Sequence, residues 1–382
     1  MIKKPTSLLT KLLTIVFALA IVAGLGWSLM RQNQEAQELE QNNSSTFVDK
    51  TEVIDTGEDT EDTPSETKKK KKETQTLYTK LSKGKAVKIA VIGDTFGASV
   101  GATPGMEWDV KLKEALEGTY KSEVTVDNFS VAVTTAYQGY CTVKQNDWDS
   151  YDLVLVCFGS MDQNGELSYF QRDYECIIRG LRAKNDGMVI MPMISTYVND
   201  SNYSGTVRDI ADQYHLDCLN MNNAFVDSGM EEEELTTDGT YPNDTGYQLY
   251  ADSVANQIAE NIQNNAEIYS SKVSAQYDGV REMDSLTFVS ADDLVYVSDN
   301  EYSYTGDATV LGVSYQPVST GSDTLTILVN GYPINTIDCV TSYDLDKTHY
   351  AIGASDLSED DTVTIRVSND SGMEFNGIMV SE

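Results

Sequence analysis

Residues 89–99 read IAVIGDTFGAS. An apolar run leads directly into a glycine, an aspartate and a threonine, and more small residues follow. An uninterrupted apolar run that ends in glycine and short polar residues indicates a buried strand followed by a tight turn. This turn presents the hydroxyl of Thr95. Whether that hydroxyl can act as a nucleophile depends on the side chains of the loops around it.

The same alternation of buried strand and amphipathic segment continues through residues 77–270. Apolar runs occur at KIAVIG, EVTVDNFSV, DLVLVCFG, MVIMPMI and LDCLNM, with helix-like segments at 109–118, 167–184 and 203–214. A last helix is expected to open at Asn243 or Asp244, because apolar residues recur there at spacings of three and four. Continuous apolar strands separated by helices predict a parallel sheet covered on both faces, an α/β sandwich.

The helical period disappears in residues 285–382. Short alternating stretches such as TLTILVNG and TVTIRVS are separated by Asp, Ser and Gly turns. This pattern predicts an antiparallel β-sandwich of the jelly-roll or immunoglobulin-like type. Its acidic residues lack the spacing of a calcium loop, so we interpret them as solvated surface rather than calcium ligands.

The amino terminus predicts a membrane anchor in residues 1–30. The run Leu12–Met30 carries no charge and as a helix would span about 28 Å. Lys3, Lys4 and Lys11 precede it and Arg31 follows it, which places the amino terminus in the cytoplasm and the bulk of the chain outside the cell. We therefore expect a single-pass protein of the cell membrane.

A cleaved signal peptide is the alternative for this segment. Ala18 and Ala20 form an A-x-A pattern, but they lie in the middle of an apolar run that exceeds the usual ~7–15 residues of a signal. Residues 31–76 are rich in Gln, Glu, Asn, Ser, Thr and Asp and close with the run Lys68–Lys72, so they predict a disordered linker.

The composition excludes several classes of function. The 382 residues carry a formal charge of −33 and only two histidines, which disfavours nucleic acid as a partner. The cysteines show no metal-ligand spacing, and their number is odd for an exported chain, so we expect no disulfide framework, no metal and no cofactor. These cysteines are Cys141, Cys157, Cys176, Cys218 and Cys339.

Four loops are expected to converge at the carboxyl edge of the sheet, where α/β proteins bind ligands. They read GDTFGAS at 93–99, DNFSVAVTT at 127–135, FGSMDQN at 158–164 and DGTYPNDTGY at 238–247. Together they resemble the blocks of the SGNH (GDSL-like) hydrolase family, in the same order and at similar separations, over roughly residues 85–265. That resemblance implies a flavodoxin-like three-layer sandwich, and members of the family are esterases, lipases, and polysaccharide or peptidoglycan O-acetyl esterases and transferases.

This sequence keeps the scaffold motifs of the family but differs at the positions that give the family its name. The nucleophilic serine corresponds to Thr95, the second-block glycine to Val133, the third-block asparagine to Met161 and the catalytic histidine to Tyr241. The acid of the last block is retained as Asp238. The residues expected to contact a ligand are Asp94, Thr95, Gly159, Asp162, Asp238, Tyr241 and Asn243.

Elementary chemistry argues against ordinary acyl transfer by this set. A hydroxyl becomes nucleophilic when a neighbouring base takes its proton, and a tyrosine with a pKa near 10 offers a donor where an acceptor is required. Methionine removes a side-chain donor from the oxyanion hole, and we expect Val133 to weaken the hole as well. His215 is predicted at the opposite end of the sheet, and His349 reaches the site only if the β-sandwich folds over it.

Three hypotheses follow for the function. The favoured one is a catalytically impaired, membrane-anchored protein that binds or scaffolds cell-envelope polysaccharide or its modification machinery. The second is an active esterase, O-acetyltransferase or deacetylase of surface glycans with Thr95 as nucleophile. The third makes the β-sandwich the carbohydrate-binding part and the α/β unit its support.

Overall fold

In the computed structural model, the described residues are 75–269, 273–298 and 300–381. All of them belong to one compact unit, Lys72–Glu382. Within these ranges, none of the helices has the length and apolar character required to cross a bilayer. The predicted anchor at 1–30 and almost all of the predicted linker at 31–76 lie outside the described residues, so both stay predictions.

The α/β domain is built on a five-stranded parallel sheet with the order β2-β1-β3-β4-β5. This is the flavodoxin-like order, in which ligands bind beyond the carboxyl ends of the strands. The strands are β1 (Val87–Gly93), β2 (Val124–Asn128), β3 (Leu153–Cys157), β4 (Val189–Ile194) and β5 (Leu219–Asn220). The predicted fold class is confirmed; only β5 is much shorter than the run LDCLNM indicated.

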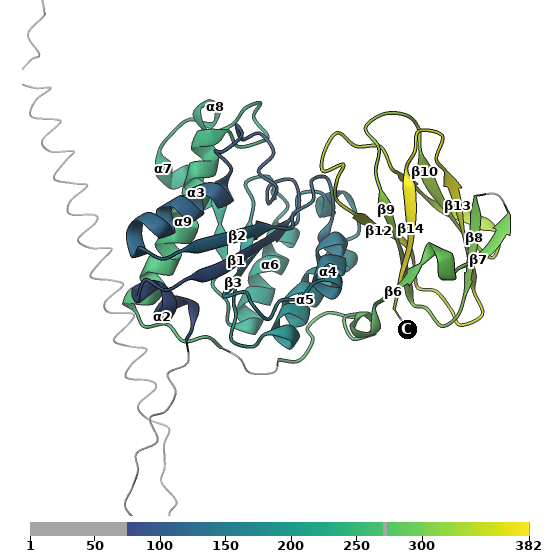
Figure 1. The fold of residues 1–382 in the computed structure, drawn as a ribbon, viewed down its shortest axis with the longest axis horizontal. Coiled ribbons are helices and arrows are strands. Elements are labelled where there is room, and N and C mark those ends of the chain that lie inside the picture. The colour runs from purple at the N-terminus through teal and green to yellow at the C-terminus, as the bar shows by residue number, and fades with distance from the viewer. Residues whose placement is uncertain (1–74, 270–272, 299, 382) are drawn as a thin grey trace, which may run out of the picture. The chain divides into compact units, whose positions relative to one another are not determined.

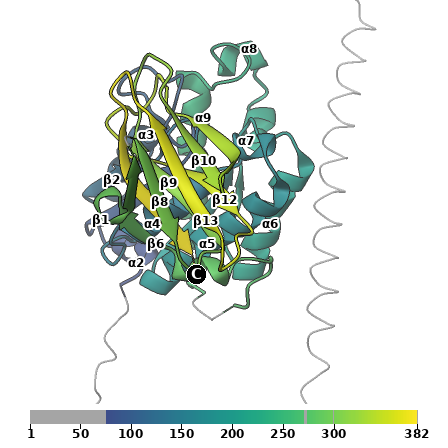
Figure 2. The ribbon, with the colours of Figure 1, turned by 90° about the vertical axis from the view of Figure 1, so that its right-hand side faces the viewer.

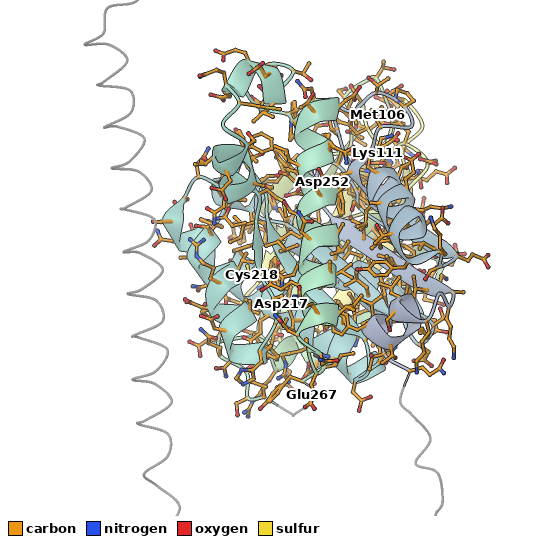
Figure 3. All side chains as sticks on the ribbon, turned by 90° about the vertical axis from the view of Figure 1, so that its left-hand side faces the viewer. Met106, Lys111, Asp217, Cys218, Asp252 and Glu267 are labelled. Carbon is orange, nitrogen blue, oxygen red and sulfur yellow. The ribbon has the colours of Figure 1, made fainter. Side chains whose placement is uncertain are left out.

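Helices cover both faces of this sheet, because successive side chains of each strand point to opposite sides. On β1, Ile89 and Val91 belong to one buried cluster, and Ala90 and Ile92 belong to the other. The first cluster receives α2 (Leu77–Ser82), α3 (Trp108–Tyr120) and α9 (Asp244–Gln263). Figure 3 looks onto this face, with Lys111 on α3 and Asp252 on the neighbouring α9.

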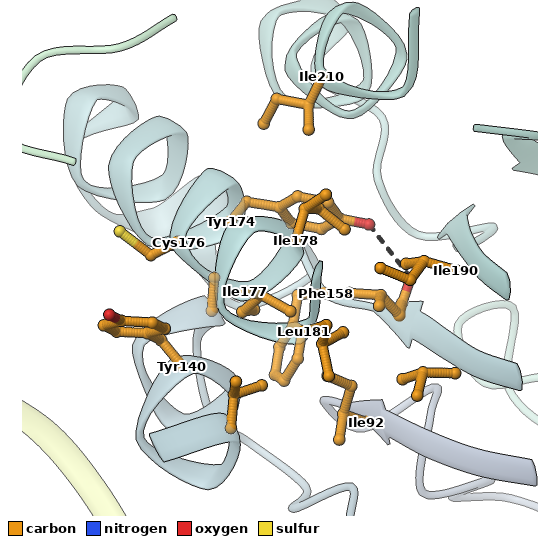
Figure 4. Close-up of a cluster of buried hydrophobic side chains, with 14 of the residues drawn as sticks. Ile92, Tyr140, Phe158, Tyr174, Cys176, Ile177, Ile178, Leu181, Ile190 and Ile210 are labelled. Atoms are coloured by element: carbon orange, nitrogen blue, oxygen red, sulfur yellow. Dashed lines mark hydrogen bonds between the residues drawn. The ribbon is translucent and has the colours of Figure 1, made fainter. Parts of the chain in front are cut away.

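The second face is covered by α4 (Ala136–Gln145), α5 (Leu167–Lys184) and α6 (Ser201–Tyr214). Figure 4 shows Phe158, Ile177 and Leu181 filling the space between α5 and the strands. Two short helices, α7 (Met221–Ser228) and α8 (Glu232–Leu235), precede the last loop of the site. Burial of apolar side chains on both faces holds the strand ends, and therefore the loops, in fixed positions.

The carboxyl-terminal β domain contains two antiparallel sheets (Figures 1 and 2). One has the order β11-β10-β13-β8-β7 and the other β12-β9-β14-β6, and a separate apolar cluster lies between them. The strands are β6 (Thr287–Ser290), β7 (Val295–Ser298), β8 (Glu301–Thr305), β9 (Val310–Gln316), β10 (Thr324–Val329), β11 (Tyr332–Asp338), β12 (His349–Ser355), β13 (Thr362–Ser368) and β14 (Glu374–Ser381). The predicted antiparallel sandwich is confirmed.

The two domains share an apolar interface along α4. Val310 of β9 and Met379 of β14 belong to the same buried cluster as α4 and α5. Tyr137 packs so closely on Gly312 that a Cβ there would lie 2.2 Å from the tyrosine hydroxyl. The Gln138 side chain accepts a hydrogen bond from the Tyr350 amide at 2.7 Å. Such contacts fix the β domain against the loops that begin at α4.

Candidate active site

The turn after β1 is so tight that two of its positions require glycine. A Cβ on Gly93 would lie 2.7 Å from the carbonyl oxygen of Cys157, and one on Gly97 would lie 2.6 Å from the Ser130 hydroxyl. The Phe96 carbonyl accepts a hydrogen bond from the Trp108 indole at 3.0 Å, which ties the turn to α3. The stretch quoted at the outset is therefore a rigid platform for residues 94–96.

Asp94 is fully buried and links two loops of the site. Its carboxylate accepts hydrogen bonds from the Phe96 amide at 3.0 Å and from the Ser160 amide and hydroxyl at 3.0 and 2.6 Å. Burial raises its pKa from 3.8 to about 6, although the three hydrogen bonds oppose that shift. We predicted a ligand contact here; the structure instead makes Asp94 a support, since no surface of it is accessible.

Thr95 lies at the bottom of the site with 2% of its surface exposed. Its hydroxyl accepts a hydrogen bond from the Val133 amide at 2.9 Å. Within the described residues, no carboxylate, imidazole or other acceptor receives a hydrogen bond from this hydroxyl, and the Thr95 amide has no partner. The Thr95 hydroxyl therefore has one donor beside it and, among the described residues, no base to which it donates.

Val133 adopts the left-handed backbone conformation that favours glycine, with φ +62°. This conformation costs a β-branched residue about 1–3 kcal/mol. Because the backbone keeps this conformation, its amide still points at the position-95 oxygen. The valine side chain, 45% exposed, thus leaves this backbone N–H beside the Thr95 hydroxyl, and the expected weakening of the oxyanion hole stays a prediction.

The third loop, residues 158–164, keeps its glycine but lacks one side-chain hydrogen-bond donor. Gly159 has φ +125°, a value that favours glycine. Asp162 is buried, and one of its oxygens accepts a hydrogen bond from the Ala136 amide at 2.9 Å, which orients the start of α4. Burial holds the pKa of Asp162 well above its usual range. Met161 carries a thioether in the asparagine position, so this side chain donates no hydrogen bond.

In the last loop, the side chains of Asp238 and Asn243 accept hydrogen bonds from backbone amides. One Asp238 oxygen accepts the amides of Thr240 and Tyr241 at 3.0 and 3.1 Å. The side-chain oxygen of Asn243 caps α9 by accepting the amides of Thr245 and Gly246, so this predicted ligand contact is a helix cap. Tyr241 is half-buried, and its pKa is raised above 10.0 by burial and by nearby Tyr343, which leaves it a donor at neutral pH.

Aromatic rings surround the entrance to Thr95. The Phe96 ring stacks against Tyr197 at 5.8 Å and lies 6.0 Å from the Tyr241 ring. Tyr197 is 39% exposed and Tyr343 is 36% exposed. Neither tyrosine belongs to a sequence motif, and the sequence analysis missed both; Tyr343 comes from the β domain, 96 residues beyond the last loop, which ends at residue 247.

The β domain also holds the second loop directly. The connection between β11 and β12, residues 339–348, lies against residues 130–133 and is called the strap loop below. Its Asp344 carboxylate accepts the Ala132 amide at 2.7 Å, and its Lys347 ammonium donates to the Ser130 carbonyl at 2.6 Å. Asp344 and Lys347 form an ion pair with each other at 3.0 Å. Sequence reasoning gave no signal for this contact.

A cavity of 280 Å³ lies between the domains beside these loops. Val133, Met161 and Asp162 line it from the α/β domain, and His349 and Tyr350 line it from the β domain. His349 is buried, burial lowers its pKa, and its Nε2 lies 3.4 Å from the Asp344 carbonyl. The β domain thus does fold over the site, as the sequence analysis required for His349 to approach, but the imidazole makes no hydrogen bond to Thr95.

Among the described residues, the other candidate side chains and cavities do not form a second catalytic or metal-binding site. His215 ends α6 and packs its ring against Tyr269 at 4.1 Å, away from the carboxyl edge of the sheet. A larger cavity of 990 Å³, lined by Tyr140, Arg179 and Arg182 among others, contains none of the residues predicted for the site. Among the residues that the structure describes, no three His, Cys, Asp or Glu side chains are grouped to hold a metal ion. All five cysteines are free thiols.

Comparison with known proteins agrees with this geometry. The model of the GDSL-like Lipase/Acylhydrolase family matches residues 91–249. This match covers most of the α/β domain and none of the β domain, so the α/β domain is similar to the GDSL-like (SGNH) family. No curated protein matches the sequence.

Two solved structures share the arrangement of both domains. One is a two-domain esterase (CEX) active on acetylated mannans, with a TM-score of 0.60, 16% identity and coverage of 79% of this chain and 93% of that chain. The other is the same type of esterase co-crystallized with mannopentaose, with a TM-score of 0.59, 16% identity and coverage of 79% and 92%. At this identity the likeness establishes the two-domain fold.

Proposed function

We propose that this protein binds acylated polysaccharide of the cell envelope through a GDSL-like site that no longer hydrolyses esters efficiently. The observation that carries the proposal is the environment of Thr95. Its hydroxyl accepts a hydrogen bond from the Val133 amide and, in the described part of the chain, donates to no base. An alcohol without an adjacent base is a poor nucleophile.

The features that remain are suited to binding. The Val133 amide lies 2.9 Å from the Thr95 hydroxyl oxygen, and the Thr95 amide makes no hydrogen bond within the described residues, so both can donate to a ligand carbonyl oxygen. Exposed rings of Tyr197 and Tyr343 flank the entrance and offer the flat apolar surfaces on which sugar rings stack. A site with donors, aromatic walls and no base can retain an acylated sugar without cleaving it.

Charge narrows the choice of glycan. With a formal charge of −33, the chain repels polyanionic polymers at ordinary ionic strength. A neutral, O-acetylated polysaccharide is therefore the preferred ligand class, in line with the acetylated mannans on which the structurally similar CEX esterase acts. The apolar run at 12–30 would hold the protein at the cell membrane, with the site outside.

The test is titration calorimetry of the full-length chain with O-acetylated glucomannan oligosaccharides and with the same oligosaccharides after alkaline deacetylation. We expect binding of the acetylated form, weaker binding of the deacetylated form and no release of acetate over hours. Absence of binding to either form, or acetate release, would contradict the proposal.

One observation favours the alternative of a surviving esterase or O-acetyltransferase. The Val133 amide is still placed as an oxyanion donor, which the sequence had not led us to expect. If acetate is released and the release disappears in a Thr95→Ala variant, this second function replaces the first.

A further inference from the structure

We infer that the β domain controls the candidate active site through the strap loop, with Asp344 and Lys347 as positioning residues for the Val133 amide. In this role the strap loop positions the backbone of residues 130–133, whichever ligand the site binds. This role is the same whether the site binds acylated glycans or also cleaves them.

The loop that carries Val133 has an unfavourable conformation of its own. Val133 is a β-branched residue at φ +62°, and nearly half of its surface is exposed, so packing of its side chain does little to hold it there. Such a conformation persists only when the surrounding structure over-determines it.

The strap loop provides that constraint on both sides of the strained residue. The Asp344 carboxylate accepts the amide of Ala132, the residue directly before Val133, at 2.7 Å. The Lys347 ammonium donates to the carbonyl of Ser130 at 2.6 Å and pairs with Asp344 at 3.0 Å. These are charge-assisted hydrogen bonds, the stronger kind, between residues about two hundred positions apart in the chain.

The strap loop is itself held by the β domain. The side chain of Gln316 on β9 donates to the Leu345 carbonyl, and the Lys347 amide closes a turn on the Asp344 carbonyl at 3.0 Å. Asp344 has φ +48°, a left-handed conformation that aspartate tolerates better than most residues. The constraint therefore runs from the β sheet through the strap loop to the donor at Thr95.

Hydrogen exchange of the full-length chain, read by mass spectrometry on peptides that cover residues 129–136, tests this proposal. In Asp344→Ala, we expect exchange of the Ala132 and Val133 amides to accelerate at least about tenfold, a loss of about 1.4 kcal/mol of local protection. Peptides from β1 and β3 should keep their exchange rates. Asp346→Ala removes the same charge from an exposed position of the same loop and should leave residues 129–136 unchanged.

A second variant separates positioning from simple structural support. In a Val133→Gly background the left-handed conformation carries no steric penalty, so adding Asp344→Ala should accelerate exchange of the position-133 amide less than in the native background. Equal acceleration in both backgrounds would overturn the proposal. Unchanged exchange at 129–136 in Asp344→Ala, or acceleration spread equally over β1 and β3, would also overturn it.

Discussion

Restoring three side chains, Thr95→Ser, Met161→Asn and Tyr241→His, is expected to turn this site into a working esterase. Serine removes the methyl group beside the attacking oxygen, and histidine supplies a base whose pKa is near neutrality. The carboxylate for that histidine is already present: Asp238 uses one oxygen for the amides of residues 240 and 241, and its other oxygen accepts no hydrogen bond from the described residues.

The structure allows the contribution of each change to be estimated. One backbone donor is in place, the Val133 amide, which lies 2.9 Å from the position-95 hydroxyl oxygen. The missing donor at Met161 corresponds to a factor of about 10²–10³ in kcat, or about 2.7–4 kcal/mol. The base contributes a further factor of about 10²–10⁴.

The assay compares kcat/KM for a nitrophenyl acetate in two variants. The double variant Thr95→Ser, Tyr241→His should show weak activity, and adding Met161→Asn should raise it by about 10²–10³. A matched control with alanine at position 95 should be inactive in both backgrounds. Equal rates for the double and triple variants would refute the reasoning, because the oxyanion hole would then need no donor from position 161.

Three further outcomes test other parts of the account. Asp94 has a folded pKa of about 6 against 3.8, so the folded state binds its proton more tightly; its contribution to the unfolding free energy should fall by about 2 kcal/mol between pH 4 and 7. Urea unfolding should therefore show a difference between the native chain and Asp94→Asn that changes with pH, and a constant difference would contradict the burial of this carboxylate. Tyr343→Ala should weaken binding of acetylated glucomannan roughly fivefold by calorimetry, whereas Tyr332→Ala, which removes a 76% exposed ring elsewhere on the β domain, should not. Gly312→Ala should lower the unfolding free energy by about 1–3 kcal/mol because its Cβ meets Tyr137, while Gly118→Ala in α3, with no atom within 4 Å, should be neutral or stabilising; equal effects of the two would contradict the interface.

Periodicity predicts the α/β domain well because its elements have one clear pattern each. The helix expected at 167–184 is α5 (Leu167–Lys184), and Asn243 begins α9 as its cap. Helix α4 was missed for a physical reason. Its residues 136–143 are all buried between the sheet and the β domain, so no polar face is left to give a helical period.

The residues of the candidate site also differ in how well a local sequence pattern predicts them. The sequence analysis placed the loops of Thr95 and Val133 at the same edge of the sheet, and in the structure a hydrogen bond joins these two residues. Asp344 and Tyr343 could not be predicted, because they lie in a polar turn of the other domain and no local pattern encodes a contact over about two hundred residues. The roles of Asp94 as a buried support and of Asn243 as a helix cap could not be predicted, because motif letters do not show which backbone groups a side chain binds.

The central claim is that nothing in the site takes a proton from the Thr95 hydroxyl. Its most direct test is incubation of the full-length chain with a fluorophosphonate probe at neutral pH, followed by peptide mass spectrometry. The triple variant Thr95→Ser, Met161→Asn, Tyr241→His serves as the positive control. The account predicts a labelled serine in that variant and an unmodified Thr95 in the native chain, and a stoichiometric phosphonyl adduct on native Thr95 would contradict it.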